Sequence, residues 1–274
     1  MRFVAPAREA VDPAVFMRPP LSQWNEFADL LRDDWPSVAQ LNARLRDASI
    51  RFVAQTPELL ADGLHYEQRI FERGEIATRE RNWHDLLNAL AWLRYPQLKR
   101  ALNARQVAEI AKAGPKSRTR AQCALTHFDE GGIVVAVCDA ALLASWDAHD
   151  WHGLFWRERG AWSDGRIQAM VFGHALLEHA LESTKLLTGK ALAVVMAQNT
   201  NVENAADAVA AAIAGGEILN DPQELRPLPL SGIPGWHPDN GDEGFYRTAA
   251  CFRPLRAGRS YPKPLQHAAV QLMR

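Results

Sequence analysis

One segment, residues 167–182, constrains the fold most, because polar side chains interrupt its apolar pattern. At 100° per residue its large apolar side chains form one stripe along a helix, which predicts a helix packed on the core. These side chains are Ile167, Met170, Val171, Leu177 and Leu181. His174 and Glu178 lie in the middle of the stripe, one turn apart and within reach of each other. Burying such a pair costs several kcal/mol unless each group finds partners, so the segment predicts a buried polar site.

The composition of the chain is that of an ordinary globular protein. Its 274 residues are 47% hydrophobic and 23% charged, with a formal net charge of −1. A charge so close to zero gives no general attraction to nucleic acid or to an anionic membrane, so neither partner is expected. No apolar run approaches the roughly 20 residues that span a bilayer, and the N-terminus lacks the apolar run of a signal peptide.

The three cysteines also bear on the compartment of the protein. Cys123, Cys138 and Cys251 are far apart in the sequence and include no CxxC pair. Their odd number and spacing indicate neither a disulfide framework nor a cysteine zinc site. We therefore expect a cytoplasmic protein.

Helical and strand patterns are interspersed without a regular βαβ rhythm, which predicts an α+β fold, mainly helical, in one compact domain spanning residues 1–274. Residues 1–20 are punctuated by proline and are expected to form an extended arm, and residues 255–274 a C-terminal tail. Caps and apolar spacing predict helices at 22–31, 36–45 and 83–94, another ending at Gly114, and further helices at 139–157 and 201–214. Short apolar or alternating runs predict strands at 64–72, 191–196 and 249–252.

Two further apolar runs predict a β-hairpin near residues 123–137, and hence a small antiparallel sheet. Cys123–Phe128 and Ile133–Val137 are joined by Asp129-Glu130-Gly131-Gly132, in which glycine supplies the positive φ of a tight turn. Asp129 and Glu130 at the tip are candidate substrate-binding residues, because paired carboxylates suit a cation or acid–base chemistry. The alternative is that this tetrapeptide only makes the turn.

A second polar stripe lies on the predicted helix 83–94. His84, Asn88 and Trp92 follow at i, i+4 and i+8, opposite the apolar face that is expected to pack on the core. An imidazole, an amide and an indole make the mixed surface that lines a pocket. The competing interpretation is structural: Asn82 caps the helix, Asp85 suits its positive end, and His84 is an exposed first-turn residue.

His174 and Glu178 admit three interpretations. A nitrogen and an oxygen ligand at i and i+4 suit a divalent metal ion, although the spacing matches neither HExxH nor HxxEH. Without a metal, Glu178 would orient His174 and raise its basicity for general-base catalysis. The third interpretation is a buried hydrogen-bonded pair that only fixes helix packing.

Other patterns mostly exclude function classes. The chain has no dinucleotide, P-loop or serine-elbow signature. Residues 94–120 hold eight basic residues against one acid, Glu109, which favours a solvated helix face over a phosphate or RNA site. The pair His84-Asp85, with His65 upstream, leaves an HD-type phosphohydrolase as a further alternative.

Several short motifs occur in a distinctive order. They are Trp83–Trp92 followed by Tyr95-Pro96, Lys99 and Leu102-Asn103-Ala104; Phe128–Gly132; Phe172–Ala175 with Glu178; Pro227–Pro229 with Gly232, Pro234–Trp236 and Asn240; and Phe245-Tyr246 with Phe252–Pro254. This ordered set resembles the bacterial family known as domain of unknown function 3025 (DUF3025), roughly from the first helix to Pro254. The family brings no established activity, cofactor or catalytic residue. The resemblance implies a soluble, bacterial, single-domain protein.

Together these patterns predict an enzyme, and a hydrolase before other classes. The residues expected to line its pocket as catalytic groups are His84, Asn88, His174 and Glu178. His174 would be the general base or a metal ligand, and Asn88 and His84 would position substrate or stabilise negative charge.

Trp92, Asp129 and Glu130 are expected to contact a small-molecule substrate. A divalent metal ion, held by His174 and Glu178, stays open as a cofactor. The alternative function is a non-catalytic ligand-binding or scaffold protein in which the His–Glu pair is structural. The sequence predicts no oligomeric state.

Overall fold

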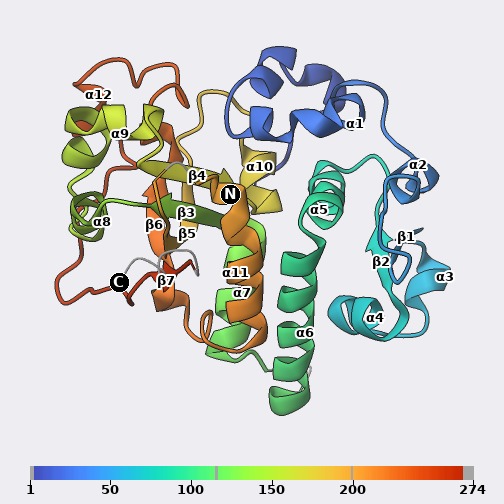
Figure 1. Cartoon of the computed structure of the whole chain (residues 1–274). Coiled ribbons are helices and arrows are strands. Elements are labelled where there is room, and N and C mark those ends of the chain that lie inside the picture. Colours follow the sequence, from blue (N-terminus) through green and yellow to red (C-terminus); the bar gives the residue numbers. More distant parts are fainter. Residues whose placement is uncertain (1–2, 115–116, 199, 268–274) are drawn as a thin grey trace.

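The structure, a computed structural model, describes residues 3–114, 117–198 and 200–267. At its centre is a mixed sheet (Figure 1) in the order β4 (Ile167–Val171), β3 (Gly132–Val137), β5 (Thr188–Val195) and β6 (Arg226–Pro229). β3 is antiparallel to β4 and parallel to β5, while β5 is antiparallel to β6 and parallel to the short β7 (Leu265–Gln266). Every residue of β3 is buried, as expected for a central strand covered on both faces.

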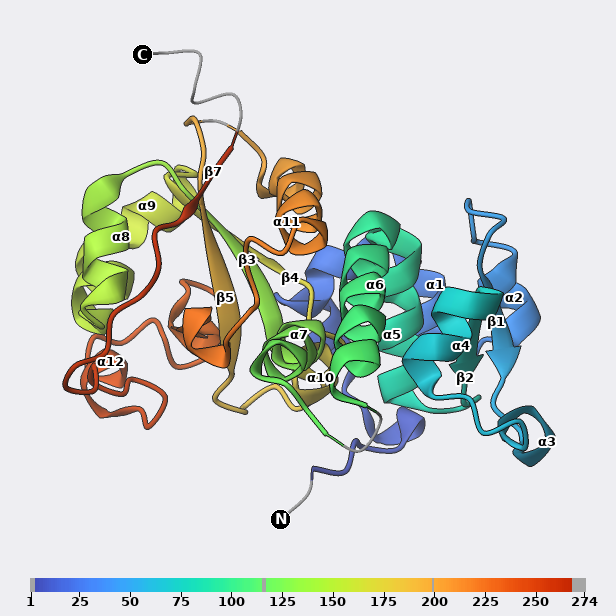
Figure 2. The same ribbon diagram turned by 90° about the horizontal axis from the view of Figure 1, so that it is seen from below.

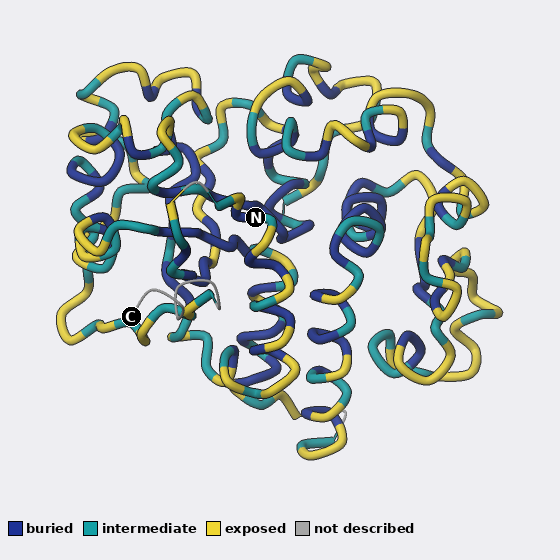
Figure 3. The backbone as a smooth tube through the Cα atoms, in the orientation of Figure 1, coloured by how far each residue is buried: buried dark blue, intermediate teal, exposed yellow. Residues whose placement is uncertain are grey.

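Helices cover both faces of this sheet (Figure 2). α8 (Ala140–Asp147) and α9 (Arg159–Ser163) lie on one face, and α7 (Arg120–Gly131), α10 (His174–His179) and α11 (Ala205–Ala214) lie on the other. A second helical layer follows, formed by α5 (Trp83–Arg94) and α6 (Pro96–Ala113). α5 packs against α10, and α6 packs against α7 and α11. Figure 3 shows that burial is concentrated along α5 and the central strands, where the core lies.

A small outer unit lies beyond α6. It consists of β1 (Arg51–Ala54), α3 (Pro57–Leu60), α4 (Tyr66–Arg73) and β2 (Glu75–Thr78), and its two strands pair in parallel, which requires the crossover that α3 and α4 provide. The buried guanidinium of Arg69 forms ion pairs with Asp62 and Glu75 and thereby fixes α4 on this unit. α4 packs against α6, so the outer unit faces the second helical layer.

The N-terminal residues cover one end of the core. They form short 3₁₀ helices at 8–10, 13–17 and 21–27, then α1 (Ala28–Arg32) and α2 (Val38–Asn42). Trp24 is fully buried. The Gln23 side chain completes the edge of β4, donating to the Ala169 carbonyl at 2.8 Å and accepting from the Val171 amide at 3.2 Å. The remaining elements are a π-helix at 153–157, 3₁₀ helices at 202–204, 222–224 and 230–232, and α12 (Phe245–Thr248).

Much of the predicted organisation is confirmed. The fold class is α+β, with helices predominant. The helices predicted at 83–94 and up to Gly114 are α5 and α6, the strand at 191–196 is the second half of β5, and α11 ends at the predicted glycine. Asn82 caps α5 as expected, accepting a hydrogen bond from the Asp85 amide. Within the predicted arm and tail, residues 1–2 and 268–274 lie outside the described residues.

The single helix predicted for residues 167–182 is wrong. Residues 167–171 form the edge strand β4, and only His174–His179 are helical. Pairing with β3 gives this mostly apolar run a place in the sheet, and such tertiary pairing outweighs a helical period. The first part of the predicted stripe, Ile167 to Val171, therefore packs in the sheet rather than on a helix.

The β-hairpin predicted at 123–137 is also wrong. Residues 120–131 form α7, whose buried residues Ala121, Ala124, Leu125 and Phe128 follow a helical period. Thr119 and Gln122 form a capping box at its start, a local signal that outweighs the turn composition of Asp129–Gly132. Asp129 and Glu130 thus lie in the last turn of a helix, directly before β3 begins.

Two predicted strands are replaced by other structure. Residues 66–72 of the predicted strand 64–72 belong to α4, because the His65 side chain caps the start of this helix and Gly74, with φ of 66°, ends it in the left-handed region. Residues 249–252 follow α12 as a turn and belong to neither sheet. No helix in the described ranges is long and apolar enough to cross a membrane.

Candidate functional site

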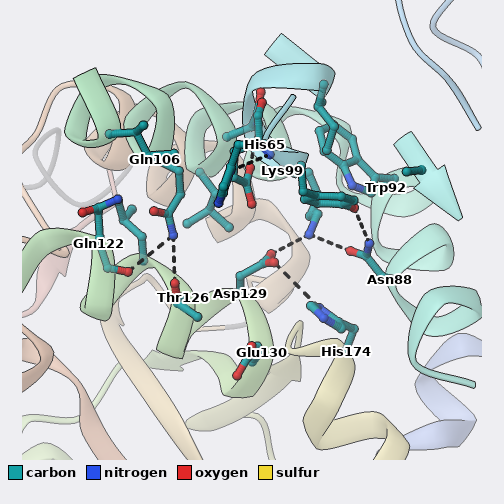
Figure 4. Close-up of a pocket in the computed structure, with 18 of the residues that line it drawn as sticks. His65, Asn88, Trp92, Lys99, Gln106, Gln122, Thr126, Asp129, Glu130 and His174 are labelled. Atoms are coloured by element: carbon teal, nitrogen blue, oxygen red, sulfur yellow. Dashed lines mark hydrogen bonds and ion pairs between the residues drawn. The ribbon is translucent and has the colours of Figure 1, made fainter. Parts of the chain in front are cut away.

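A cavity of about 320 Å³ lies between the outer unit and the helical layers (Figure 4). Its walls come from α4 and the residues beside it, from the end of β2, and from α5, α6, α7 and the first residue of α10. Six of the seven predicted site residues line it: His84, Asn88, Trp92, Asp129, Glu130 and His174. Glu178 is the exception, and it reaches the site through His84. Segments far apart in the sequence therefore converge on one polar cavity.

The two histidines contact each other directly. Nε2 of His174 lies 3.0 Å from Nε2 of His84, and the rings meet nearly edge to face, with an interplanar angle of 82°. Nδ1 of His84 lies 3.1 Å from Oε2 of Glu178. The sequence predicted that His174 and Glu178 would pair across one turn of a helix. In the structure His84 lies between them and contacts both.

A buried ion pair forms the centre of the site. The Lys99 ammonium, on α6, lies 2.5 Å from Oδ1 of Asp129 and 2.8 Å from Oδ1 of Asn88. The Asn88 amide in turn donates to the Tyr66 hydroxyl at 2.9 Å. Figure 4 shows Lys99 and Asp129 pointing toward each other, with Asn88 on one side and His174 on the other. Lys99 is only 4% exposed, so the Asp129 carboxylate compensates a charge removed from water.

Gly173 places His174 against Asp129. A Cβ at Gly173 would lie 2.4 Å from the Gly132 nitrogen and 2.6 Å from the Glu130 carbonyl oxygen, distances that backbone atoms cannot accommodate. Only glycine therefore lets the start of α10 approach the junction between α7 and β3. His174 follows immediately, and its Nδ1 comes to 3.9 Å from Oδ2 of Asp129.

The surroundings favour the charged form of Asp129 and the neutral form of His174. Burial acts to raise the pKa of Asp129, but the charge of the Lys99 ammonium and its hydrogen bond outweigh burial, so the pKa is lowered and Asp129 is ionised. Burial lowers the pKa of His174 to about 3, so its imidazole is neutral. The hydrogen bond that His84 donates to Glu178 raises the pKa of His84, against the opposing effect of burial.

The protonation state of His84 determines which nitrogen of His174 carries the proton. A protonated His84 donates through Nδ1 to Glu178 and through Nε2 to Nε2 of His174. His174, being neutral, then carries its proton on Nδ1, the atom that faces Asp129. This Nδ1 is buried and has no hydrogen-bond partner. The indole Nε1 of Trp92, another cavity residue, is a second buried donor without a partner.

The geometry bears on two sequence-based alternatives, the HD-type site and the metal site. For the HD-type site, Asp85 is engaged by Arg79 at 2.7 Å, and His65 accepts the Glu67 amide as a helix cap at 3.3 Å. Among the described residues, no group of three or more His, Cys, Asp or Glu side chains is arranged to hold a metal ion. Both ring nitrogens of His84 are within hydrogen-bond distance of other side chains, Glu178 and His174.

The chain matches a family described as "Protein of unknown function (DUF3025)" over residues 50–256. It belongs to the DUF3025 family. The resemblance noted in the sequence is thus confirmed, and the matched region contains every residue of the cavity wall named above. No curated protein and no solved structure matches the chain.

Sequence reasoning missed several cavity residues of this DUF3025 chain. On α6 the buried polar residues Lys99, Asn103 and Gln106 lie at i, i+4 and i+7 along one face and line the cavity. That spacing was present in the sequence, but the basic composition of residues 94–120 favoured a solvated face, which is wrong for Lys99. Tyr66 and Glu67 were missed because the pattern of residues 64–72 predicts a strand, whereas these two residues lie in the first turn of α4.

Proposed function

We propose that this member of the DUF3025 family is a hydrolase that cleaves a small polar molecule in the cavity by general acid–base catalysis. One observation carries the proposal. The His174 imidazole is 4% exposed, and its unpartnered Nδ1 lies 3.9 Å from the ionised Asp129. Leaving a buried donor unpaired costs about 1–3 kcal/mol, and a substrate oxygen would remove that cost. Hydrolysis needs only water and acid–base groups, which the cavity supplies.

Asp129 is the proposed base. Lys99 keeps it ionised, so its free Oδ2 can take a proton from water as the water oxygen attacks an electrophilic carbon. The N–H of His174 would then donate to the oxygen on which negative charge develops, as the donors of an oxyanion hole do. A pKa of about 3 suits this neutral donor role better than the general-base role expected from the sequence.

The other residues position these two groups. His84 and Glu178 fix the tautomer and the orientation of His174 through their hydrogen bonds, as a carboxylate does for the histidine of a catalytic triad. Asn88 uses both ends of its amide on Lys99 and Tyr66, so it holds the wall rather than the substrate. Trp92 offers its free indole N–H as a further contact, while Glu130 is exposed at the rim.

The proposed setting is a bacterial cytoplasm. The family resemblance supports the bacterial origin, and three free cysteines support a reducing compartment. Acid–base catalysis by the chain's own side chains is preferred over a metal-dependent version, because the donor atoms of His84 and Glu178 are directed at each other.

The test is hydrolysis of a panel of chromogenic esters and amides by the purified protein. His179→Gln is the matched control, because His179 lies on α10 as well but does not line the cavity. We expect wild type and the control to hydrolyse at least one class, and His174→Gln to be slower by about 10²-fold or more, as when an oxyanion-hole donor is removed.

Two results would contradict the proposal: no hydrolysis of any class, or equal rates for His174→Gln and wild type. Saturable binding of a panel compound without turnover would favour the alternative, a ligand-binding protein. Circular dichroism of each variant ensures that a lost rate is not a lost fold.

A further inference from the structure

Glu67 is a second carboxyl group in the cavity, and its surroundings differ from those of Asp129. It lies in the first turn of α4, and its Oε2 accepts a hydrogen bond of 2.6 Å from the Asn103 amide. The same amide donates to the Glu67 carbonyl at 2.8 Å, so Asn103 fixes both the side chain and its backbone. Within the described part of the chain, no lysine, arginine or histidine forms an ion pair with Glu67.

The fold brings these two carboxyl groups to one cavity from different sides. α4 and α7 flank α6 on opposite sides (Figure 2), so Glu67 and Asp129 approach the cavity from separate helices. Asp129 has an ammonium group within hydrogen-bond distance, whereas Glu67 has a neutral amide. A carboxyl that loses hydration and gains only a neutral hydrogen bond, with no cation paired to it, is more stable in its protonated form.

We propose that Glu67 is the general acid of the site and protonates the leaving group of the substrate. This inference rests on the proposed hydrolase function and deepens it. Two carboxyl groups in one site, one held ionised and one held protonated, form the arrangement from which a base and an acid are assigned.

The step balances with water as the only co-reactant. As the water oxygen forms a bond to the electrophilic carbon, Asp129 takes one water proton and His174 donates to the developing oxyanion. The bond from that carbon to the leaving group breaks with its electron pair on the leaving atom, and Glu67 gives that atom a proton. The proton on Asp129 then passes to solvent and Glu67 regains one, so the net reaction is hydrolysis.

Several charged and titratable groups line the cavity together with Glu67. They are His65 and Tyr66 beside it, Arg79 after β2, His84 and Asp85 on α5, Lys99 on α6, Arg118 before α7, Asp129 and Glu130 on α7, and His174 on α10. Burial raises the pKa of Glu67 to about 7, the charge of Asp129 adds to this, and Asn103 and Lys99 oppose it. Glu67 therefore holds its proton below about pH 7, and its activity as an acid falls as the pH rises through that value.

Leaving-group dependence tests the role directly. For the substrate class that the protein hydrolyses, we compare the rates of two substrates. One has a 4-nitrophenyl leaving group, which departs without gaining a proton, and the other has an unsubstituted phenyl leaving group, which needs a proton. We expect Glu67→Gln to lower the rate on the phenyl substrate by about 10²-fold or more and to spare the nitrophenyl substrate. Glu72→Gln, an exposed position on the same helix, should change neither rate. Equal losses on both substrates would overturn the assignment.

A second measurement needs no substrate. Carbon-13 NMR of protein labelled at its glutamate carboxyls should show one group titrating near pH 7, lost in Glu67→Gln and kept in Glu72→Gln. Absence of such a group would overturn the inference even if the protein is a hydrolase. If the titration is present but no panel compound is hydrolysed, the proposed function fails, whereas the raised pKa of Glu67 is confirmed. The acid role then falls with the function, so the two failures are distinguishable.

Discussion

Lys99 is the residue on which the charges of the site depend. Its ammonium lies 5.4 Å from the centre of the Trp92 ring and 5.9 Å from that of Phe172, and its hydrogen-bonding partners are Asp129 and Asn88. Such an environment stabilises a buried cation through ring faces and hydrogen bonds together. The Lys99 ammonium in turn keeps Asp129 ionised. Removing either charge would leave the other buried without its partner.

Replacing Lys99 by methionine should therefore lower the free energy of unfolding by about 3 kcal/mol at neutral pH. The folded-state pKa of Asp129 is lowered in wild type, so the pair stabilises above the pKa of an unfolded aspartate and is lost as the pH falls through the folded value. In Lys99→Met the pKa of Asp129 should rise, so the deficit should shrink in mild acid. Urea denaturation at about pH 7 and pH 5 measures this, and equal deficits would contradict it.

The pKa values of His174 and His84 should be shifted in opposite directions. Nitrogen-15 NMR should show His174 neutral down to about pH 3, with its proton on Nδ1 while His84 is protonated, and His84 with a pKa above its ordinary value. Because that pKa is raised in the folded state, the pairing with Glu178 stabilises below the unfolded pKa and is lost as the pH rises through the folded one. Glu178→Gln should lower the pKa of His84. An unchanged His84 titration in this variant would show that the hydrogen bond does not set it.

At the scale of elements, the site depends on the junction where α7 ends, β3 begins and α10 approaches. Gly173→Ala should destabilise the protein by about 1–3 kcal/mol, because the added methyl group meets backbone atoms of Glu130 and Gly132. Gly160→Ala in α9 is the control, since a methyl group there meets no atom within 4 Å. The melting temperature of Gly173→Ala should lie well below that of the control. The added methyl group should also move His174 away from Asp129. Equal melting temperatures would show that α10 can shift at little cost.

The sequence predicted elements well where the signals are local, and badly where pairing partners decide. α5 has its cap, its apolar face and a proline after its end, and its bounds were predicted to the residue. β4 became a strand only because β3 lies beside it, and no local feature of residues 167–171 reveals that. The same distinction applies to the site. His84 and His174 were found as polar residues on apolar helices, but their contact, and the burial of Lys99, depend on helices brought together by the whole fold.

At the scale of the whole molecule, the core extends beyond the residues that match the family. Residues before position 50 lie outside the matched range, yet Leu21, Trp24 and Leu31 are buried in the same core as the sheet. Arg94 on α5 adds to this attachment, because it binds the Gln23 carbonyl and stacks on Trp24. The N-terminal segment is thus part of the structure that holds α5 and its histidine.

A chain that begins at residue 50 should therefore not unfold cooperatively as the full chain does. Removing the segment exposes apolar surface on α5 and β4 and leaves the edge of β4 without the Gln23 side chain. Calorimetry and binding of a hydrophobic dye would report a broadened transition and exposed core. A sharp transition at the melting temperature of the full chain would contradict this account.

The central claim is that the cavity is a catalytic site whose base is Asp129. The measurement that tests it most directly is the rate of hydrolysis by Asp129→Asn, beside Asp207→Asn, an exposed carboxyl on α11 away from the cavity. The amide keeps the size of the side chain but cannot accept the proton of water, so we predict a loss of about 10²–10⁴-fold in Asp129→Asn alone. Wild-type rates in Asp129→Asn, with the fold intact, would contradict the claim.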